Sequence, residues 1–143
     1  MTAGSAVRGS ASVETAVLAP ALLLLLGLGV LAGRVGTAGA AVDAAAGAAA
    51  RQASLTRTGH HAQATATRAA VESLAEQHLR CQHVTVSTDV SAFAAPPGAP
   101  GSVRVTVTCQ LALADLALPG LPGTRTLTAH AVSPLDPYRG RTR

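Results

Sequence analysis

One uninterrupted apolar run dominates the N-terminal part of the chain. It extends from Ala16 to Gly33 without a charged side chain, and Arg34 closes it. As a helix the run would reach about 27 Å, close to the ~30 Å hydrocarbon core of a bilayer. Pro20 is compatible with this, because neighbouring groups in a membrane span can satisfy the carbonyl that a proline leaves free. The pattern predicts a transmembrane helix, with the lipid bilayer as its surroundings.

Alanine-rich sequence follows the apolar run. Because Ala has the highest helix propensity, we expect one helix from about residue 12 to Arg57. A second helix is predicted at His60–Leu79, where a weak apolar stripe recurs at helical spacing. The stripe consists of Ala66, Ala69, Ala70, Leu74 and Leu79.

Beyond Cys81 the apolar residues recur with a period of two, which is typical of half-buried strands. We expect strands at 83–90, 102–113 and 125–132, followed by an irregular tail from residue 133. One face of the middle strand would consist of Val103, Val105, Val107, Cys109, Leu111 and Leu113. The predicted fold class is α+β: a long N-terminal helix that is transmembrane in its first half, a second helix, and a small antiparallel three-stranded sheet.

Composition narrows the possible functions. The 143-residue chain has one Tyr, one Phe and no Trp, and its net charge of +4 comes from scattered arginines. Nucleic-acid binding usually requires a clustered basic face with aromatic side chains to stack on bases, so no nucleic-acid partner is expected. The sequence contains no phosphate-binding glycine loop, nucleophile elbow or HExxH motif. We therefore predict that the protein is not an enzyme and has neither catalytic residues nor a cofactor.

The five histidines raise the question of a metal site. His60 and His61 are adjacent on a predicted helix, so their side chains should point apart. His78, Cys81 and His83 form a short cluster, but structural zinc sites use four ligands at closer and more regular spacing. No metal site is predicted.

Cys81 and Cys109 are the two cysteines of the chain. An even pair in a small exported domain is typical of a disulfide, the alternative being two buried free thiols. The bridge would tie the junction between the second helix and the first strand to the sheet. It would close a loop of about 29 residues, worth roughly 3.6 kcal/mol of stability. A disulfide would place the region after the span outside the cytoplasm.

Glu14 is a carboxylate at the edge of the apolar run. A capping box would need Ser or Thr three residues earlier, where Ala11 stands. Glu14 could favour the positive end of the helix dipole, worth about 0.3–1 kcal/mol, or lie among lipid headgroups. Alternatively, cleavage after Gly9 would make Ser10 the N-terminus. Glu14 would then be the fifth residue and could offset the desolvation of the new ammonium group, in the same chain or a neighbour.

The segment RGSASVETAVLAPALLLLL resembles the N-terminus of the type IV pilin superfamily, specifically TadE-like proteins of the tight-adherence (Flp) pilus system. The closing segment LADLALPGLPGTRTLTAHAVSPLDPYRGR is similar to the last strand and tail of TadE-like proteins from high-GC bacteria. The resemblance implies a short leader that a prepilin peptidase removes after Gly9. It makes Ser10 the first mature residue and gives Glu14 a role in assembly. The leader is weakly charged, with Arg8 as its one basic residue.

The resemblance also implies an organisation and a function. Residues 1–9 would be the leader, 10–57 the transmembrane and extended helix, and 58–143 an extracytoplasmic domain. The protein would be a pilin or pseudopilin that helps to assemble Flp-type pili for adhesion or secretion. Its partners would be other Tad/Flp pilins, assembly-platform proteins and the prepilin peptidase. It would cross the cell membrane once, or stand outside the cell within a pilus.

The sequence is also compatible with two alternatives. The chain could be a secreted binding domain with a conventional signal peptide, residues 1–40, because Ala38 and Ala40 form a small-residue cleavage site. Against it, the apolar run of about 18 residues is longer than the roughly 7–15 typical of signal peptides. The second alternative is a permanent single-span protein that is never processed.

Overall fold

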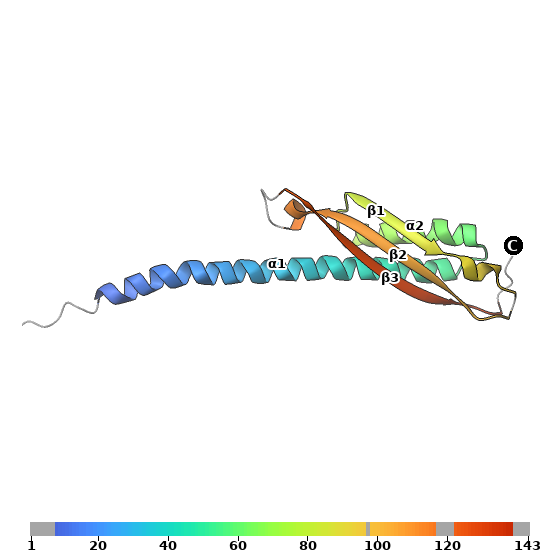
Figure 1. Cartoon of the computed structure of the whole chain (residues 1–143), viewed down its shortest axis with the longest axis horizontal. Helices are drawn as coiled ribbons and strands as arrows, with labels where there is room; N and C mark the ends of the chain where they lie inside the picture. The colour runs from blue at the N-terminus through green and yellow to red at the C-terminus, as the bar shows by residue number, and fades with distance from the viewer. Residues whose placement is uncertain (1–7, 97, 117–121, 139–143) are drawn as a thin grey trace, which may run out of the picture. The chain divides into compact units, whose positions relative to one another are not determined.

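Two helices and three strands follow one another along the chain in the predicted order (Figure 1). The structure is a computed structural model that describes residues 8–96, 98–116 and 122–138; of residues 8–15, 115 and 116 it describes the backbone alone. The chain divides into two compact units, Met1–Arg34 and Val35–Arg143. The predicted fold class is confirmed: a long first helix, a second helix and a three-stranded antiparallel sheet.

The first helix, α1, is continuous over Arg8–Ser54 and contains Pro20. It ends slightly before the predicted Arg57, because local hydrogen bonds close its last turn. The Ser54 hydroxyl donates to the carbonyl of Arg51, and the Thr56 hydroxyl donates to the carbonyl of Ala53, both at 2.8 Å. These bonds satisfy carbonyls that the end of a helix leaves without partners.

The second helix, α2, spans Gly59–Glu76 and begins at a side-chain cap. Thr58 is extended, and its hydroxyl accepts a hydrogen bond from the His61 N–H at 3.3 Å. Threonine is a favoured residue at this position because it satisfies one of the unpaired N–H groups of the first turn. The buried face of α2 consists of Ala62, Ala66, Ala70 and Leu74. The predicted stripe therefore missed Ala62, and its Ala69 is only half-buried.

A tight turn ends α2 before the predicted Leu79. His78 has a left-handed backbone conformation with φ of 55°. Its N–H donates to the carbonyl of Ala75 at 2.9 Å, and the N–H of Leu79 donates to the carbonyl of Leu74 at 3.0 Å. This pair of bonds is a Schellman motif, which normally has glycine at the left-handed position. The motif turns the chain towards Cys81 and packs Leu79 against the core.

The sheet has the strand order β1-β2-β3 and is antiparallel throughout. Its strands are β1 (His83–Asp89), β2 (Gly101–Ala112) and β3 (Thr124–Leu135). Two short 3-10 helices lie between them, η1 (Ser91–Ala94) and η2 (Leu113–Leu116). In each strand alternate residues face the two sides of the sheet, as the period of two predicted.

The irregular tail predicted from Ser133 is partly wrong. Ser133, Pro134 and Leu135 continue β3 and pair with Val103, Ser102 and Gly101 of β2. Proline is tolerated here because β3 lies at the edge of the sheet, where the missing N–H costs no ladder bond. The last tail residues, 139–143, lie outside the described residues.

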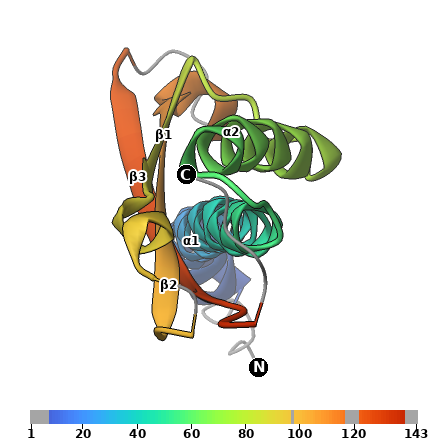
Figure 2. The same cartoon turned by 90° about the vertical axis from the view of Figure 1, so that its right-hand side faces the viewer.

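The core of the second unit is built from small side chains on one side and branched ones on the other. On β2, Val103, Val105, Val107 and Cys109 are completely buried, and Leu111 is 1% exposed. Alanines of α1 and α2 face them, so that both helices cover one face of the sheet (Figure 2). The buried residues of α1 are Ala38, Ala41, Val42, Ala45, Ala46, Ala49, Ala50 and Ala53. Alanine lets a helix approach the sheet closely. It contributes little buried apolar area, however, and hydrophobic stabilisation scales with that area.

A disulfide joins Cys81 to Cys109, with a Cα–Cα distance of 5.4 Å. Cys81 lies between the turn that ends α2 and the start of β1, and Cys109 faces inward from β2 opposite Val84. The bridge therefore ties the segment between α2 and β1 to the middle strand of the sheet.

We expect the disulfide to supply much of the stability of this small domain. Denatured, non-reduced protein should show no free thiol on labelling. Replacing both Cys81 and Cys109 with Ala should lower the free energy of unfolding by roughly 3–4 kcal/mol, measured by urea titration of the full chain in detergent. Reduced wild-type protein is the control and should unfold close to the double variant. Two labelled cysteines in the non-reduced wild type would contradict the bridge.

Candidate functional site

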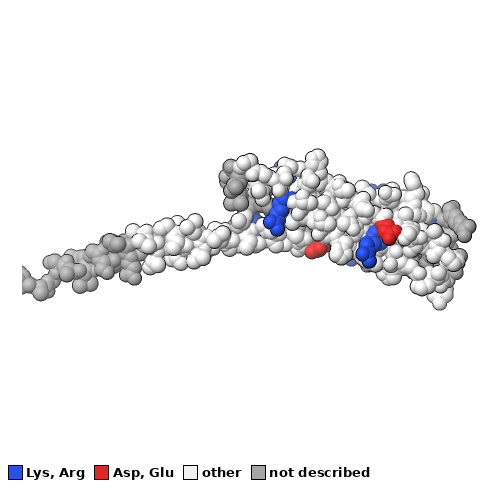
Figure 3. Space-filling model, viewed as in Figure 1, with Lys and Arg blue, Asp and Glu red and all other residues white. Residues whose placement is uncertain are grey.

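The first half of α1 exposes large apolar side chains on every side. Leu22–Leu26 are 64–71% exposed, and five successive helical residues point in all directions around the axis. None of the most apolar window of this helix is buried, and it carries no charge (Figure 3). Because a helix that is apolar all round needs apolar surroundings, this segment is suited to a bilayer or to a bundle of similar helices.

The residues predicted for processing and assembly lie at the start of the same helix. Gly9 and Ser10 belong to the first turn of α1, which begins at Arg8, and leader residues 1–7 lie outside the described residues. Glu14 is one turn beyond Ser10, so both lie on the same side of the helix. Of Glu14 the structure describes the backbone alone.

The position of Glu14 bears on its dipole interpretation. It is the seventh residue of α1 counted from Arg8, and the first turn contains no acidic residue. The effect of the helix dipole falls off within the first turn. In the uncleaved chain the helix dipole should therefore stabilise the Glu14 carboxylate little. The roles of Glu14 in processing and assembly stay predictions. The remaining predicted site residues, Cys81 and Cys109, form the disulfide of the second unit.

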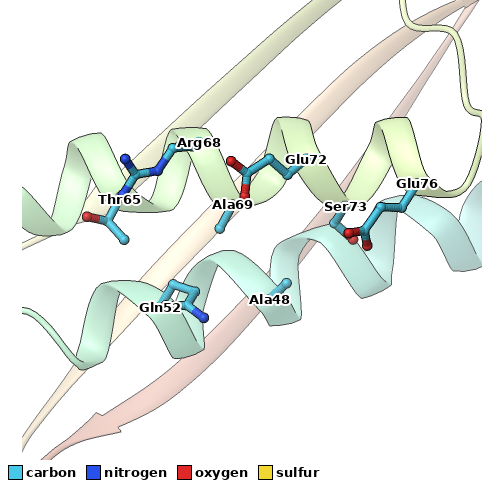
Figure 4. Close-up of a pocket in the computed structure, with 8 residues that line it drawn as sticks. All are labelled: Ala48, Gln52, Thr65, Arg68, Ala69, Glu72, Ser73 and Glu76. Carbon is cyan, nitrogen blue, oxygen red and sulfur yellow. The ribbon is translucent and has the colours of Figure 1, made fainter.

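A shallow groove of about 330 Å³ runs between α1 and α2 within the second unit (Figure 4). It is lined by Ala48 and Gln52 of α1 and by Thr65, Arg68, Ala69, Glu72, Ser73 and Glu76 of α2. The hydroxyl of Ser73 interacts with the amide of Gln77 at 3.4 Å, not with a histidine that could activate it. Within the described residues the groove holds no nucleophile and base in contact.

His78 and Cys81, two members of the cluster considered for metal binding, have structural roles. His78 forms the left-handed turn after α2, and Cys81 is in the disulfide. The rings of His60 and His61 lie 6.0 Å apart between centroids. In the described part of the chain, no three His, Cys, Asp or Glu residues lie close enough to hold a metal ion.

The sheet also has a charged end, at the turn after β1. The Ser91 N–H donates to the Asp89 carboxylate at 3.0 Å, and Arg104 lies opposite Asp89 across the strands. The hydrogen bonds from Ser91, with a smaller contribution from Arg104, hold the pKa of Asp89 below its usual value. The arrangement fixes an exposed turn and brings no second reactive group to it.

The comparisons with known proteins point to the N-terminal helix. A family model described as TadE-like protein matches residues 9–51. The match begins at Gly9 and covers nearly all of α1, including the apolar run. It confirms the TadE-like resemblance of the N-terminal segment; the resemblance of the closing segment, from Leu113 onwards, lies outside the matched residues and stays a prediction. No curated protein and no solved structure gives a match to the chain.

The apolar run should carry the membrane affinity of the chain. Replacing Leu24 and Leu25 together with Arg should cost about 5–7 kcal/mol at the centre of a span and shift the protein out of the membrane fraction. The matched control is Val71→Arg, because Val71 is an exposed apolar residue of α2, 48% exposed, outside the run. It should remain in the membrane fraction. Equal fractionation of the double variant and the control would contradict the assignment of the span.

Proposed function

We propose that this chain, which is TadE-like over residues 9–51, is a pilin or pseudopilin: a membrane-anchored structural component of a Tad pilus system that contributes to adhesion or secretion. The observation that supports this most is the composition of α1. The first half of this one helix is apolar on all sides, and the second half contributes a buried alanine face to a disulfide-bonded domain. An anchor and a displayed domain are the two parts that such a component needs.

The exposed apolar side chains in the first half of α1 can be shielded from water in two ways. In the membrane, lipid surrounds the exposed leucines of α1. In an assembled filament, the apolar helices of neighbouring copies would take the place of lipid. Since both surroundings are apolar, transfer between them costs little hydrophobic free energy, and packing and polar contacts decide which one is favoured. Partners in this proposal are other Tad pilins and assembly-platform proteins.

Processing would occur at the start of α1. A prepilin peptidase would cleave after Gly9 and leave Ser10 as the first mature residue. The bond lies in the first turn of the helix, where few backbone hydrogen bonds are made. Glycine further lowers the cost of unwinding this turn, because it is a poor helix former. The new ammonium of Ser10 would then lie one turn from Glu14.

The secreted alternative fits the structure less well. Its cleavage site, after Ala40, lies in the interior of α1, and the flanking Ala38 and Ala41 are both 4% exposed. Cleavage there would remove part of the core-facing helix and begin the mature domain at a buried residue. A signal peptide that supplies core residues to the mature domain would be an unfavourable arrangement.

Cleavage after Gly9 can be tested on the intact protein. The mass of the wild-type membrane protein should correspond to a chain that begins at Ser10. Gly9→Leu should keep the full 143-residue mass, because a bulky side chain would block the peptidase. Ser10→Ala is the control and should be processed. A wild-type chain that begins at Ala41 would contradict the pilin proposal and favour secretion.

Glu14 should act between copies and not in folding. Glu14→Ala should be inserted and processed and should keep its disulfide, yet crosslink poorly to neighbouring copies. Removing one partner of a partly buried ion pair costs about 3–5 kcal/mol, which is enough to weaken assembly. Crosslinking yield is scored beside membrane level, with Glu14→Asp as the conservative control. Unchanged crosslinking of Glu14→Ala would restrict Glu14 to a local role in its own helix.

A further inference from the structure

One end of the second unit carries basic side chains on both helices. In the sequence, every charged residue between Asp43 and Glu72 is an arginine, and two histidines accompany them. Because α1 ends and α2 begins within this stretch, the turn between the helices brings these residues to the end that faces the viewer in Figure 2. All of them are exposed, and we refer to them as the basic end: Arg51, Arg57, His60, His61 and Arg68.

The arginines of the basic end are unpaired in the described part of the chain. The guanidinium groups of Arg51, Arg57 and Arg68 make neither a hydrogen bond nor an ion pair there. The Arg68 side chain extends towards Thr65 and away from Glu72, the next acidic residue of α2 (Figure 4). Because a guanidinium group carries five N–H donors in a planar fork, each of these arginines can bind a carboxylate from outside.

A shallow recess of about 280 Å³ opens at the basic end. It is lined by His60, His61, Ala64, Thr65 and Arg68. The imidazole rings, the hydroxyl and the guanidinium group can all donate hydrogen bonds to an anionic oxygen. The adjoining groove of Figure 4 includes Glu72 and Glu76, whereas no acidic residue of the described chain lines the recess. A group with negative charge is therefore the ligand that suits the recess.

Two carboxylates lie near the basic end and do not cancel its charge. Asp89, at the end of β1, lies opposite Arg104 across the strands, so these opposite charges offset each other. Asp136 follows the end of β3, where the Ser133 hydroxyl donates at 3.0 Å to the hydroxyl of Ser54, the last residue of α1. One carboxylate therefore stands against the three arginines of the basic end.

We infer that the basic end binds an acidic polysaccharide, a chain of sugars that carries carboxylate groups at intervals. The inference rests on the proposed function and deepens it, because a domain displayed outside the cytoplasm for adhesion meets polymers of this kind on the surfaces of cells. Arginine and carboxylate form bidentate hydrogen-bonded pairs, and the recess supplies further donors for the sugar oxygens. The basic end is thus the contact surface through which the displayed domain adheres.

The exposure of these cations favours a polymer over a small anion. A single ion pair at an exposed site contributes little, because water and salt screen it. A polymer with several carboxylates can engage several arginines together, and each contact after the first forms within one complex. His60 and Arg68 are eight residues apart, about 12 Å along the helix, so successive charged sugars can reach different cations.

A nucleic acid is the competing class of polyanion. Proteins that bind single strands stack the bases on aromatic side chains. No Phe, Tyr or Trp of the described chain lines the recess, so it offers no such platform. A polysaccharide, which has charged groups but no bases, needs none.

Binding to defined polymers tests the partner. Full-length protein in a neutral detergent is titrated with polygalacturonate, which is carboxylated, and with dextran, which is uncharged. It should bind polygalacturonate alone, and the affinity should fall as sodium chloride is added. Equal binding to dextran would overturn the inference. Tighter binding to duplex DNA, at the same concentration of negative charge, would overturn the choice of a polysaccharide.

Charge removal tests the surface. Combining Arg51→Gln, Arg57→Gln and Arg68→Gln should weaken binding to polygalacturonate about tenfold, because several exposed ion pairs are lost at once. The matched control removes three exposed arginines outside the basic end: Arg80→Gln, Arg104→Gln and Arg125→Gln. Since both variants lose the same net charge, the control should bind nearly as well as wild type. Equal losses in the two variants would mean that net charge alone is recognised and would overturn the assignment.

An added carboxylate tests the recess. Thr65→Asp places a negative charge in its lining and should lower the affinity about tenfold, because it brings like charges together. Thr67→Asp adds the same charge to an exposed position of the same helix, about 200° further around the axis, and should change little. An equal effect of the two substitutions would show that the recess is not used.

Further readouts separate this inference from the proposed function. Circular dichroism and the absence of free thiol at Cys81 and Cys109 show that each variant is folded. If the wild-type chain lies in the membrane, begins at Ser10 and does not bind polygalacturonate, the inference fails and the proposed function stands. If it is released as a soluble chain that begins at Ala41 and binds, the proposed function fails while the basic end keeps its ligand.

Discussion

The apolar first half of α1 must be covered, and the other properties of the chain depend on how this is done. Its leucines are exposed on all sides, and leaving such a surface in water would cost about 25 cal/mol per Å². A bilayer covers it completely along a length that matches the run. If lipid anchors this half of α1, the bilayer then fixes the direction in which the helix leaves the membrane. In the proposed function, anchoring would also make neighbouring copies parallel, which is the geometry that side-by-side assembly requires.

The second half of the same helix meets a different constraint. Its core face is alanine, so it can lie close to the sheet and to α2 but contributes little buried area. Branched residues of β2 fill the remaining space, and Phe93 is the one aromatic side chain in the core of the described chain. A core of this kind is weakly stabilised by burial alone. The disulfide between Cys81 and Cys109 compensates, because it removes conformational freedom from the unfolded chain.

The apolar run, alanine propensity and hydrophobic periodicity together predicted the two α-helices and three strands, and local hydrogen bonding decided where the helices end. The alternation along β2 predicted the buried Val103, Val105, Val107, Cys109 and Leu111 correctly, because this face of the strand packs on the helices. Leu113 was wrongly included in this face: β2 ends at Ala112, and Leu113 begins η2 and is only half-buried. The end of α2 was missed because it depends on a left-handed histidine, His78, at a position that usually requires glycine. The extra length of β3 comes from pairing with β2, which carries the strand through Pro134.

The proposed anchoring requires that α1 lies in lipid through its first half and outside the cytoplasm in its second half. Single cysteines report this directly, since the native pair is in a disulfide. Chains with Leu24→Cys or Ala44→Cys are treated with a membrane-impermeant thiol reagent in intact cells. We predict that position 44 is labelled in the cell-associated protein, while position 24 is labelled only after detergent dissolves the membrane. Equal labelling of both positions in intact cells, or release of the Ala44→Cys protein into the medium as a soluble chain, would contradict the account.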